Sequence, residues 1–148
     1  MSIEVSSMNK DLSIALNIPE DRYEYIMSYI VQMIKDYNGS VVDIIKEIPL
    51  NLKGKERYFA MFTVGNSFAS SFSAMDEDDK QEVITDILEA TKVNKERTEK
   101  IADQMMEKVI KDIDKDITVI DTIKGVINDK LTDAEKDYVM FTFGLVST

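Results

Sequence analysis

The chain has 148 residues with 18 basic and 28 acidic side chains, which gives a formal net charge of −10 at pH 7. It contains no Cys and no His, so disulfides, thiolate nucleophiles, Cys/His zinc sites and Ser-His-Asp arrangements are excluded. The negative charge disfavours direct binding to nucleic acid and to anionic membranes, because both carry charge of the same sign. Only 5 Gly and 2 Pro leave little room for the turns of an all-β protein, which favours helices.

The N-terminal segment precedes the first periodic pattern. Residues 1–17 are expected to form a mobile end followed by a short segment that packs on the body of the protein. This end has no basic region followed by an apolar run, so no signal peptide is expected. A cytoplasmic location is therefore predicted.

Two helices are predicted next. Apolar residues recur at spacings of three and four from Pro19 onward, which predicts a helix that ends at Asn38-Gly39. A short helix over residues 41–48 follows and is expected to end at Pro49, because proline interrupts the hydrogen-bond pattern of a helix.

The third predicted helix contains the eighteen uncharged residues from Tyr58 to Met75. That length can span a membrane. However, Asn66, Thr63 and four serines argue against a membrane span and favour a buried helix at the centre of the protein. Asn51 is expected to cap this helix.

A fourth helix is predicted over residues 76–91. It begins with an acidic run, which suits the positive end of a helix dipole. Ser73 or Asp76 is expected to cap it.

The second half of the chain repeats the first. Residues 52–65 align without a gap on residues 131–144, and six of the fourteen positions are identical. The identical pairs are Leu52/Leu131, Glu56/Glu135, Met61/Met140, Phe62/Phe141, Thr63/Thr142 and Gly65/Gly144. Helices over residues 94–113 and 119–126 are likewise predicted as copies of the first two helices. Self-similarity of this kind indicates a duplicated structural unit.

The predicted fold is therefore all-α, a seven-helix single-domain bundle built from an internally duplicated three-helix unit with pseudo-twofold symmetry. Repeat 1 is expected over about residues 19–69, a connecting segment and helix over 70–92, and repeat 2 over about 94–148. Phe62 and Phe141 are expected in the core near the pseudo-axis.

Thr132 and Glu135 have the spacing of a capping box at the start of the last helix. Glu56 and Glu135 are also the only acidic identities of that alignment. They are candidates for a pair of carboxylates that face each other across the pseudo-axis and hold a metal or a proton. The alternative is that each Glu only complements the dipole of its own helix.

The end of the uncharged helix has no equivalent in the second repeat. Phe72 and Met75 are therefore expected either at a homodimer contact or under the helix over residues 76–91, and the homodimer is preferred. Ser67 and Ser71 are candidates for the same contact with a partner protein or a second copy of the chain. No other binding surface is predicted.

The spacing of Asp112, Asp114 and Asp116 is similar to the start of a calcium-binding EF-hand loop. Such a loop needs Gly at its sixth position and Glu at its twelfth. Ile117 and Ile123 occupy those positions, so no calcium site is expected. No catalytic residue, cofactor or metal is predicted.

By exclusion, the sequence favours a non-enzymatic protein–protein interaction module, such as an adaptor, regulator or complex subunit. One alternative is an acidic inhibitor that mimics nucleic acid and occupies the basic groove of a nucleic-acid-binding protein. Another is a carrier of a small ligand or lipid, with a cavity between the two duplicated helices.

Overall fold

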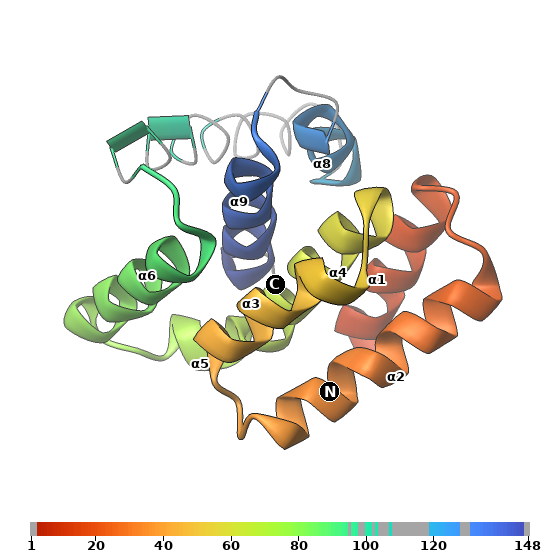
Figure 1. Cartoon of the computed structure of the whole chain (residues 1–148), viewed down its shortest axis with the longest axis horizontal. Helices are drawn as coiled ribbons and strands as arrows, with labels where there is room; N and C mark the ends of the chain where they lie inside the picture. The colour runs from red at the N-terminus through yellow and green to blue at the C-terminus, as the bar shows by residue number, and fades with distance from the viewer. Residues whose placement is uncertain are drawn as a thin grey trace.

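A computed structural model describes residues 3–94, 96–97, 100–101, 103, 107, 119–127 and 131–146. Eight helices and no strand occur within these residues, which confirms the all-α prediction (Figure 1). The helices are α1 (Ile3–Ala15), α2 (Glu20–Asp36), α3 (Val41–Asn51), α4 (Gly54–Ser67), α5 (Ala69–Ser73), α6 (Glu77–Thr91), α8 (Val119–Ile127) and α9 (Asp133–Val146). The predicted helix over residues 94–113 lies mostly outside the described residues.

Helices α4 and α9 form the centre of the molecule. All residues from Tyr58 to Asn66 are buried in α4, and all from Asp137 to Leu145 are buried in α9. The first half of the uncharged stretch, from Tyr58 to Asn66, is thus part of a central core helix, as predicted. Phe62 and Phe141 are both fully buried, so the predicted core position of each is confirmed.

The two central helices run side by side in the same direction. Arg57 bonds to Asp137 near their starts, and the Asn66 amide donates to the Gly144 carbonyl near their ends. A Cβ atom on Gly65 would overlap the Phe141 carbonyl oxygen, and a Cβ on Gly144 would overlap the Phe62 carbonyl oxygen. The two glycines therefore bring the helix backbones into direct contact.

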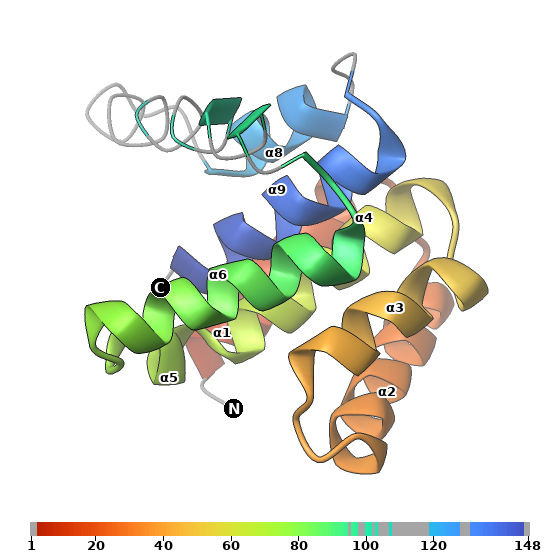
Figure 2. The same cartoon turned by 60° about the vertical axis from the view of Figure 1, so that its left-hand side comes forward.

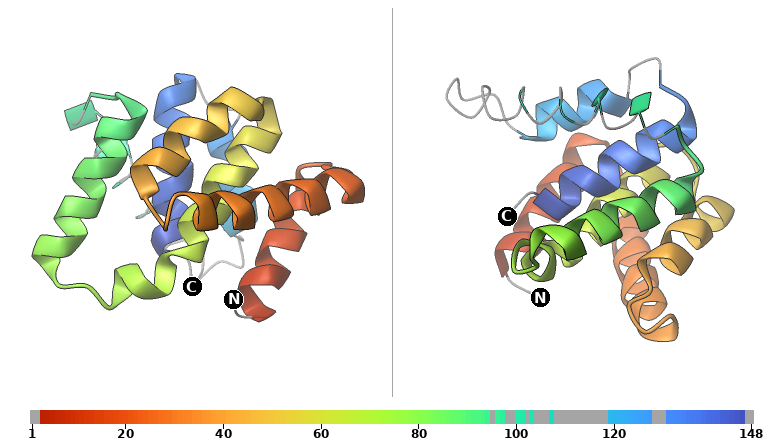
Figure 3. Two further views of the ribbon diagram at one scale, coloured as in Figure 1. Left: turned by 60° about the horizontal axis from the view of Figure 1, so that its bottom comes forward. Right: turned by 90° about the vertical axis from the view of Figure 1, so that its left-hand side faces the viewer.

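The other helices cover this central pair. Helices α1, α2 and α3 pack against α4, whereas α6 and α8 pack against α9. Helix α6 also contacts α3 and runs alongside the central pair (Figure 2). The turned views in Figure 3 show α2 and α8 on opposite sides of α4 and α9.

The N-terminal prediction was partly wrong, because Ile3–Ala15 is helix α1 rather than a mobile end. Leu12 at 0% exposure anchors this helix in the core, and Leu16 and Ile18 are buried after it. Asn17 ends the helix with a left-handed backbone at φ 58°. The expected packing of this segment on the body is thus present, but in helical form.

The long uncharged helix is divided in two, contrary to the prediction. Phe68 separates α4 from α5, and its N–H bonds to the Gly65 carbonyl three residues back. Ser67 donates to the Thr63 carbonyl at 2.9 Å, a bond that commonly bends helices. The seven-helix count was therefore wrong, since α1 is added and one helix is split.

Two boundary predictions near α3 were also wrong. The helix continues past Pro49 to Asn51, because a proline this close to the end removes only one hydrogen bond, and the Leu52 N–H still bonds to the Ile48 carbonyl. Asn51 does not cap α4 and instead donates to the Tyr29 hydroxyl at 2.8 Å.

The other two caps were predicted correctly. The Asp79 N–H donates to the Asp76 carboxylate at 2.8 Å at the start of α6. At α9, the Glu135 N–H donates to the Thr132 hydroxyl and the Thr132 N–H donates to the Glu135 carboxylate, both at 3.1 Å. This reciprocal pair is the expected capping box.

Candidate binding cleft

A cleft of about 400 Å³ opens between α3, α4, the end of α6 and the start of α9. Four charged side chains line it: Lys46, Arg57, Lys92 and Asp137. Ile45, Pro49 and Ala90 add apolar surface. We call this hollow the basic cleft. Its volume is within the range of about 300–1,000 Å³ that is common for ligand pockets.

An ion pair between α4 and α9 forms part of the cleft wall. The Arg57 Nε donates to both Asp137 carboxylate oxygens at 3.0 and 3.1 Å, and Nη2 donates to one of them. The two side chains are only 16% and 4% exposed. Burial raises the pKa of the Asp137 carboxyl, and the Arg57 guanidinium opposes this shift. The hydrogen bond to Asp137 raises the pKa of Arg57, which stays charged.

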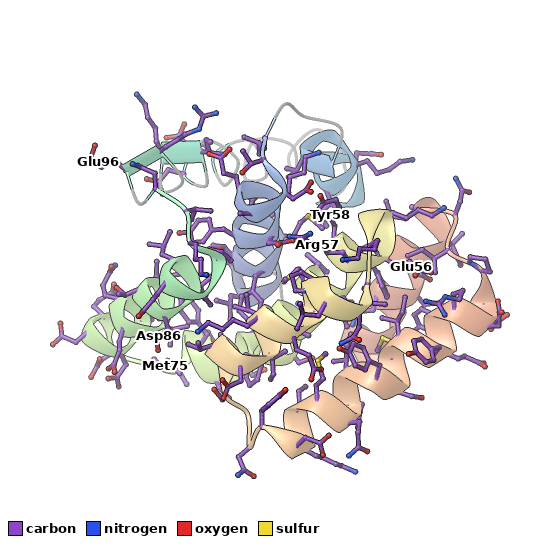
Figure 4. All side chains as sticks on the ribbon, viewed as in Figure 1. Glu56, Arg57, Tyr58, Met75, Asp86 and Glu96 are labelled. Atoms are coloured by element: carbon purple, nitrogen blue, oxygen red, sulfur yellow. The ribbon has the colours of Figure 1, made fainter. Side chains whose placement is uncertain are left out.

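Tyr58 adds a second link beside this ion pair. Its hydroxyl donates to the Asp133 carboxylate at 2.6 Å, and burial raises the pKa of the phenol. Figure 4 shows Arg57 and Tyr58 on adjacent positions of α4, where they reach toward α9. The start of α9 is therefore held to α4 by polar side-chain bonds.

Lys46 and Lys92 stand at the mouth of the cleft. Both are exposed, and neither ammonium group has a hydrogen bond or ion pair within the described part of the chain. Lys92 ends α6 with a left-handed backbone at φ 57°, a conformation that costs energy for a residue with a side chain. Leu50 lies one turn after Lys46 and is 77% exposed.

A second hollow of about 420 Å³ adjoins the first and shares Lys92 and Ala134 with it. Arg97 and Glu135 line this hollow, and the Arg97 Nε donates to Glu135 at 2.6 Å. Together the two hollows carry four basic and two acidic side chains. This local positive excess contrasts with the net charge of −10 for the whole chain.

The structure gives each of the two predicted paired carboxylates its own arginine. Arg22 on α2 donates to Glu56 at 3.0 and 2.9 Å, and Arg97 donates to Glu135. The Arg22 bond lowers the pKa of Glu56, and the Thr132 N–H is the main cause of a lowered pKa at Glu135. The described residues contain no group of three or more acidic side chains that could hold a metal ion. Arginine pairing, rather than metal binding, accounts for both carboxylates.

The predicted partner surface lies at α5 and just before it. Ser67 and Ser71 are exposed, whereas Phe72 and Met75 are half-buried. The Lys80 ammonium group of α6 lies 5.7 Å from the Phe72 ring centre. Helix α6 thus covers part of Phe72, and Met75 lies near the α5–α6 turn (Figure 4).

The Asp112, Asp114 and Asp116 cluster lies outside the described residues. The ligand-carrier alternative requires space between the two duplicated helices. Around Gly65 and Gly144 the helix backbones touch, so that place holds no cavity.

The sequence analysis did not identify the basic cleft. Its charged residues come from four separate helices, and only folding brings them together. The one usable signal was the group of basic residues just after α6, Lys92, Lys95 and Arg97, in an acidic half of the chain.

Comparisons of this chain with protein-family models, with curated proteins and with solved structures find no match. Among the described residues, no helix has both the length and the apolar character needed to cross a membrane. Any function must therefore be argued from the cleft and the surfaces themselves.

Proposed function

We propose that this protein is a non-enzymatic protein–protein interaction module whose basic cleft binds an acidic segment of a partner. The observation that carries the proposal is the pair Lys46 and Lys92, two exposed ammonium groups at the mouth of a cleft that have no partner among the residues the structure describes. Leu50, which lies one turn after Lys46 in α3 and is exposed, offers an apolar contact. A partner segment that combines acidic and apolar side chains fits this surface.

Electrostatics supports this choice of partner. Lysine side chains at a cleft mouth attract an opposite charge and speed its encounter, an effect that salt weakens. The remaining surface of the chain is acidic and repels the same segment. Binding is therefore expected only at the cleft, and its rate of association is expected to fall as salt is added.

Cross-linking in native lysate followed by mass spectrometry tests the proposal. The double variant Lys46→Glu/Lys92→Glu should lose a partner that the wild type captures, because it reverses both charges. The control Lys35→Glu/Lys124→Glu makes the same change in net charge on exposed lysines of α2 and α8. Equal capture by both variants would show that the cleft does not bind the partner.

We also propose that the fold arose by duplication around a pseudo-twofold axis. Gly65 and Gly144, which occupy aligned positions, make reciprocal contacts with Phe141 and Phe62. The aligned Glu56 and Glu135 each pair with an arginine, and these arginines lie 75 positions apart.

The repeat unit in this proposal contains one more helix than the sequence alignment indicates. Helices α1 and α6 both end at a residue with left-handed backbone, Asn17 and Lys92, again 75 positions apart. Asn17 precedes Arg22, the partner of Glu56, by five positions, and Lys92 precedes Arg97, the partner of Glu135, by the same number. On this basis α1 and α6 are counterparts, and α5 connects the two units.

A second candidate function is the acidic inhibitor that mimics nucleic acid. Asp79, Glu82, Asp86 and Glu89 follow one another at spacings of three and four along one side of α6. Successive carboxylates are thus about 5–6 Å apart along the helix axis. In the same cross-linking experiment, Glu82→Gln/Glu89→Gln should lose a basic partner if this reading holds, and the lysine variant should not.

Self-association through α5 is a separate proposal. The exposed Ser67 and Ser71 and the uncovered part of Phe72 provide a small contact surface. Sedimentation equilibrium at micromolar concentration tests it, since Phe72→Asp should convert a dimer into a monomer. A monomeric wild type would exclude the dimer.

A further inference from the structure

We infer that the basic cleft recognises a single carboxylate group, which binds the Arg57 guanidinium between Lys46 and Lys92. This inference rests on the proposed docking of an acidic segment and names the atoms that hold it. It makes Arg57 the binding residue and Asp137 the residue that positions it.

In the inferred complex, the N–H groups of Arg57 donate to two acceptors, the Asp137 carboxylate and the ligand carboxylate. A guanidinium carries five N–H groups in a planar fork. Nε and Nη2 donate to Asp137, and within the described part of the chain Nη1 has no acceptor. A planar guanidinium can accept a second carboxylate on its other edge, where two parallel hydrogen bonds form.

Asp137 fixes the orientation of this fork. Its carboxylate is 4% exposed and is held on α9, which is itself packed against α4 over its whole length. The guanidinium is 16% exposed and lines the cleft. A side chain held in this way loses little further freedom when a ligand binds, which favours recognition.

Charge balance explains why the lysines are needed. Arg57 and Asp137 together are neutral, so they contribute direction but little net attraction. Lys46 from α3 and Lys92 from the end of α6 add the positive charge that a ligand carboxylate requires. A lysine is a point charge without fork geometry, whereas the arginine supplies the paired hydrogen bonds.

Two sources can supply the carboxylate, an Asp or Glu side chain or the free C-terminus of a partner. Three short peptides separate them. One has blocked ends and an internal Glu, one has a free C-terminus without an acidic side chain, and one has blocked ends with Gln in place of Glu. The Gln peptide is the control without a carboxylate.

The readout is the Nε–H resonance of Arg57 in the ¹⁵N-labelled full-length chain, which Arg57→Lys identifies by its absence. At least one carboxylate peptide should shift this resonance to saturation, and the Gln peptide should not. Backbone amide shifts then report binding in the variants. Lys46→Ala and Lys92→Ala, both surface changes, should each weaken binding several-fold, whereas Lys124→Ala should leave it unchanged.

The variant Arg57→Lys distinguishes the contribution of the guanidinium's paired hydrogen bonds from that of its positive charge. It keeps the positive charge and an ion pair with Asp137, yet it should weaken binding at least tenfold because lysine cannot donate two parallel bonds. Equal affinity in wild type and Arg57→Lys, or no saturable binding by any peptide, would overturn the inference. If partner capture still depended on Lys46 and Lys92, the proposed function would stand without the carboxylate inference. If neither partner capture nor peptide binding depended on the cleft, both proposals would be overturned.

Discussion

Alanine in place of Gly65 should destabilise this protein, although alanine normally stabilises a helix. In an exposed helix interior, Gly→Ala gains about 1 kcal/mol. At Gly65 the new Cβ would overlap the Phe141 carbonyl oxygen and lie 3.2 Å from the Phe141 Cα. All of these atoms are backbone, so no side-chain rotation can relieve the overlap.

The expected magnitude follows from the movement that the clash requires. Forcing extra atoms into a packed core costs about 1–3 kcal/mol and occasionally more. Here α4 and α9 must separate by roughly 1 Å, and a gap of about 0.5–1 Å forfeits a quarter to a half of the dispersion energy of facing atoms. Because the overlapping atoms are all backbone, the upper end of that range, about 3 kcal/mol, applies. After subtraction of the helix gain of about 1 kcal/mol, we expect Gly65→Ala to lower the free energy of unfolding by about 2 kcal/mol.

Urea unfolding followed by circular dichroism measures this effect, and the chain offers a matched control. Gly125 lies in α8, and a Cβ added there meets no atom within 4 Å. Gly125→Ala should therefore raise the free energy of unfolding by up to about 1 kcal/mol. If Gly65→Ala were stabilising to the same extent, the backbone contact between α4 and α9 would be refuted.

Three further predictions follow from the core, the ion pairs and the caps. Phe62→Ala should cost about 3–5 kcal/mol in urea unfolding, because the ring is fully buried; a loss below about 1 kcal/mol would contradict that burial. Arg22 lowers the pKa of Glu56, so this pair stabilises the protein at neutral pH and the stabilisation is lost as the pH falls through the lowered pKa. Glu56→Gln should thus flatten the acid side of a plot of unfolding free energy against pH, whereas the exposed Glu89→Gln should not. Thr132→Ala should cost about 1 kcal/mol in thermal or urea unfolding, because it removes the hydroxyl that caps α9; an unchanged stability would show that Glu135 alone suffices.

The sequence predicted the core of this protein well, because burial leaves a pattern in the residues themselves. The uncharged residues of α4 from Tyr58 to Asn66 favour burial away from water. Phe62 in α4 and Phe141 in α9 stand at identical positions of the two aligned segments, and both are buried. The caps of α6 and α9 were predictable for a similar reason, since cap and helix are neighbours in the chain.

Helix α1 was missed because its pattern is weak. Its residues Ser6, Ser7, Asn9 and Ser13 give no continuous apolar stripe, and propensity alone does not predict a helix there. Its packing depends on partners far away in the chain, such as the Thr63 hydroxyl, which lies 3.5 Å from the Asn9 side-chain oxygen. Tertiary contacts of this kind decide the conformation of a weakly patterned segment.

The basic cleft could not be predicted from the alignment, because its ion pair lies at positions that differ between the two aligned segments. Arg57 aligns with Lys136, which keeps the charge but not the guanidinium, and Asp137 aligns with Tyr58. The ion pair therefore has no counterpart at the matching positions. An alignment of the two halves identifies identical residues, such as Glu56 and Glu135. In the structure each of these two carboxylates pairs with an arginine.

Positions that differ between the halves can serve a single partner, whereas positions that are retained maintain the packing of both. In α4 and α9 the retained Phe and Gly make the reciprocal core contact, which requires the same residues on both sides. The differing Arg57 and Asp137 make a contact with only one orientation, in a cleft that the exposed Lys46 and Lys92 also line. If the fold arose by duplication and binds one partner once, as proposed above, it needs such a difference, and this is why the function is sought where the two aligned halves differ.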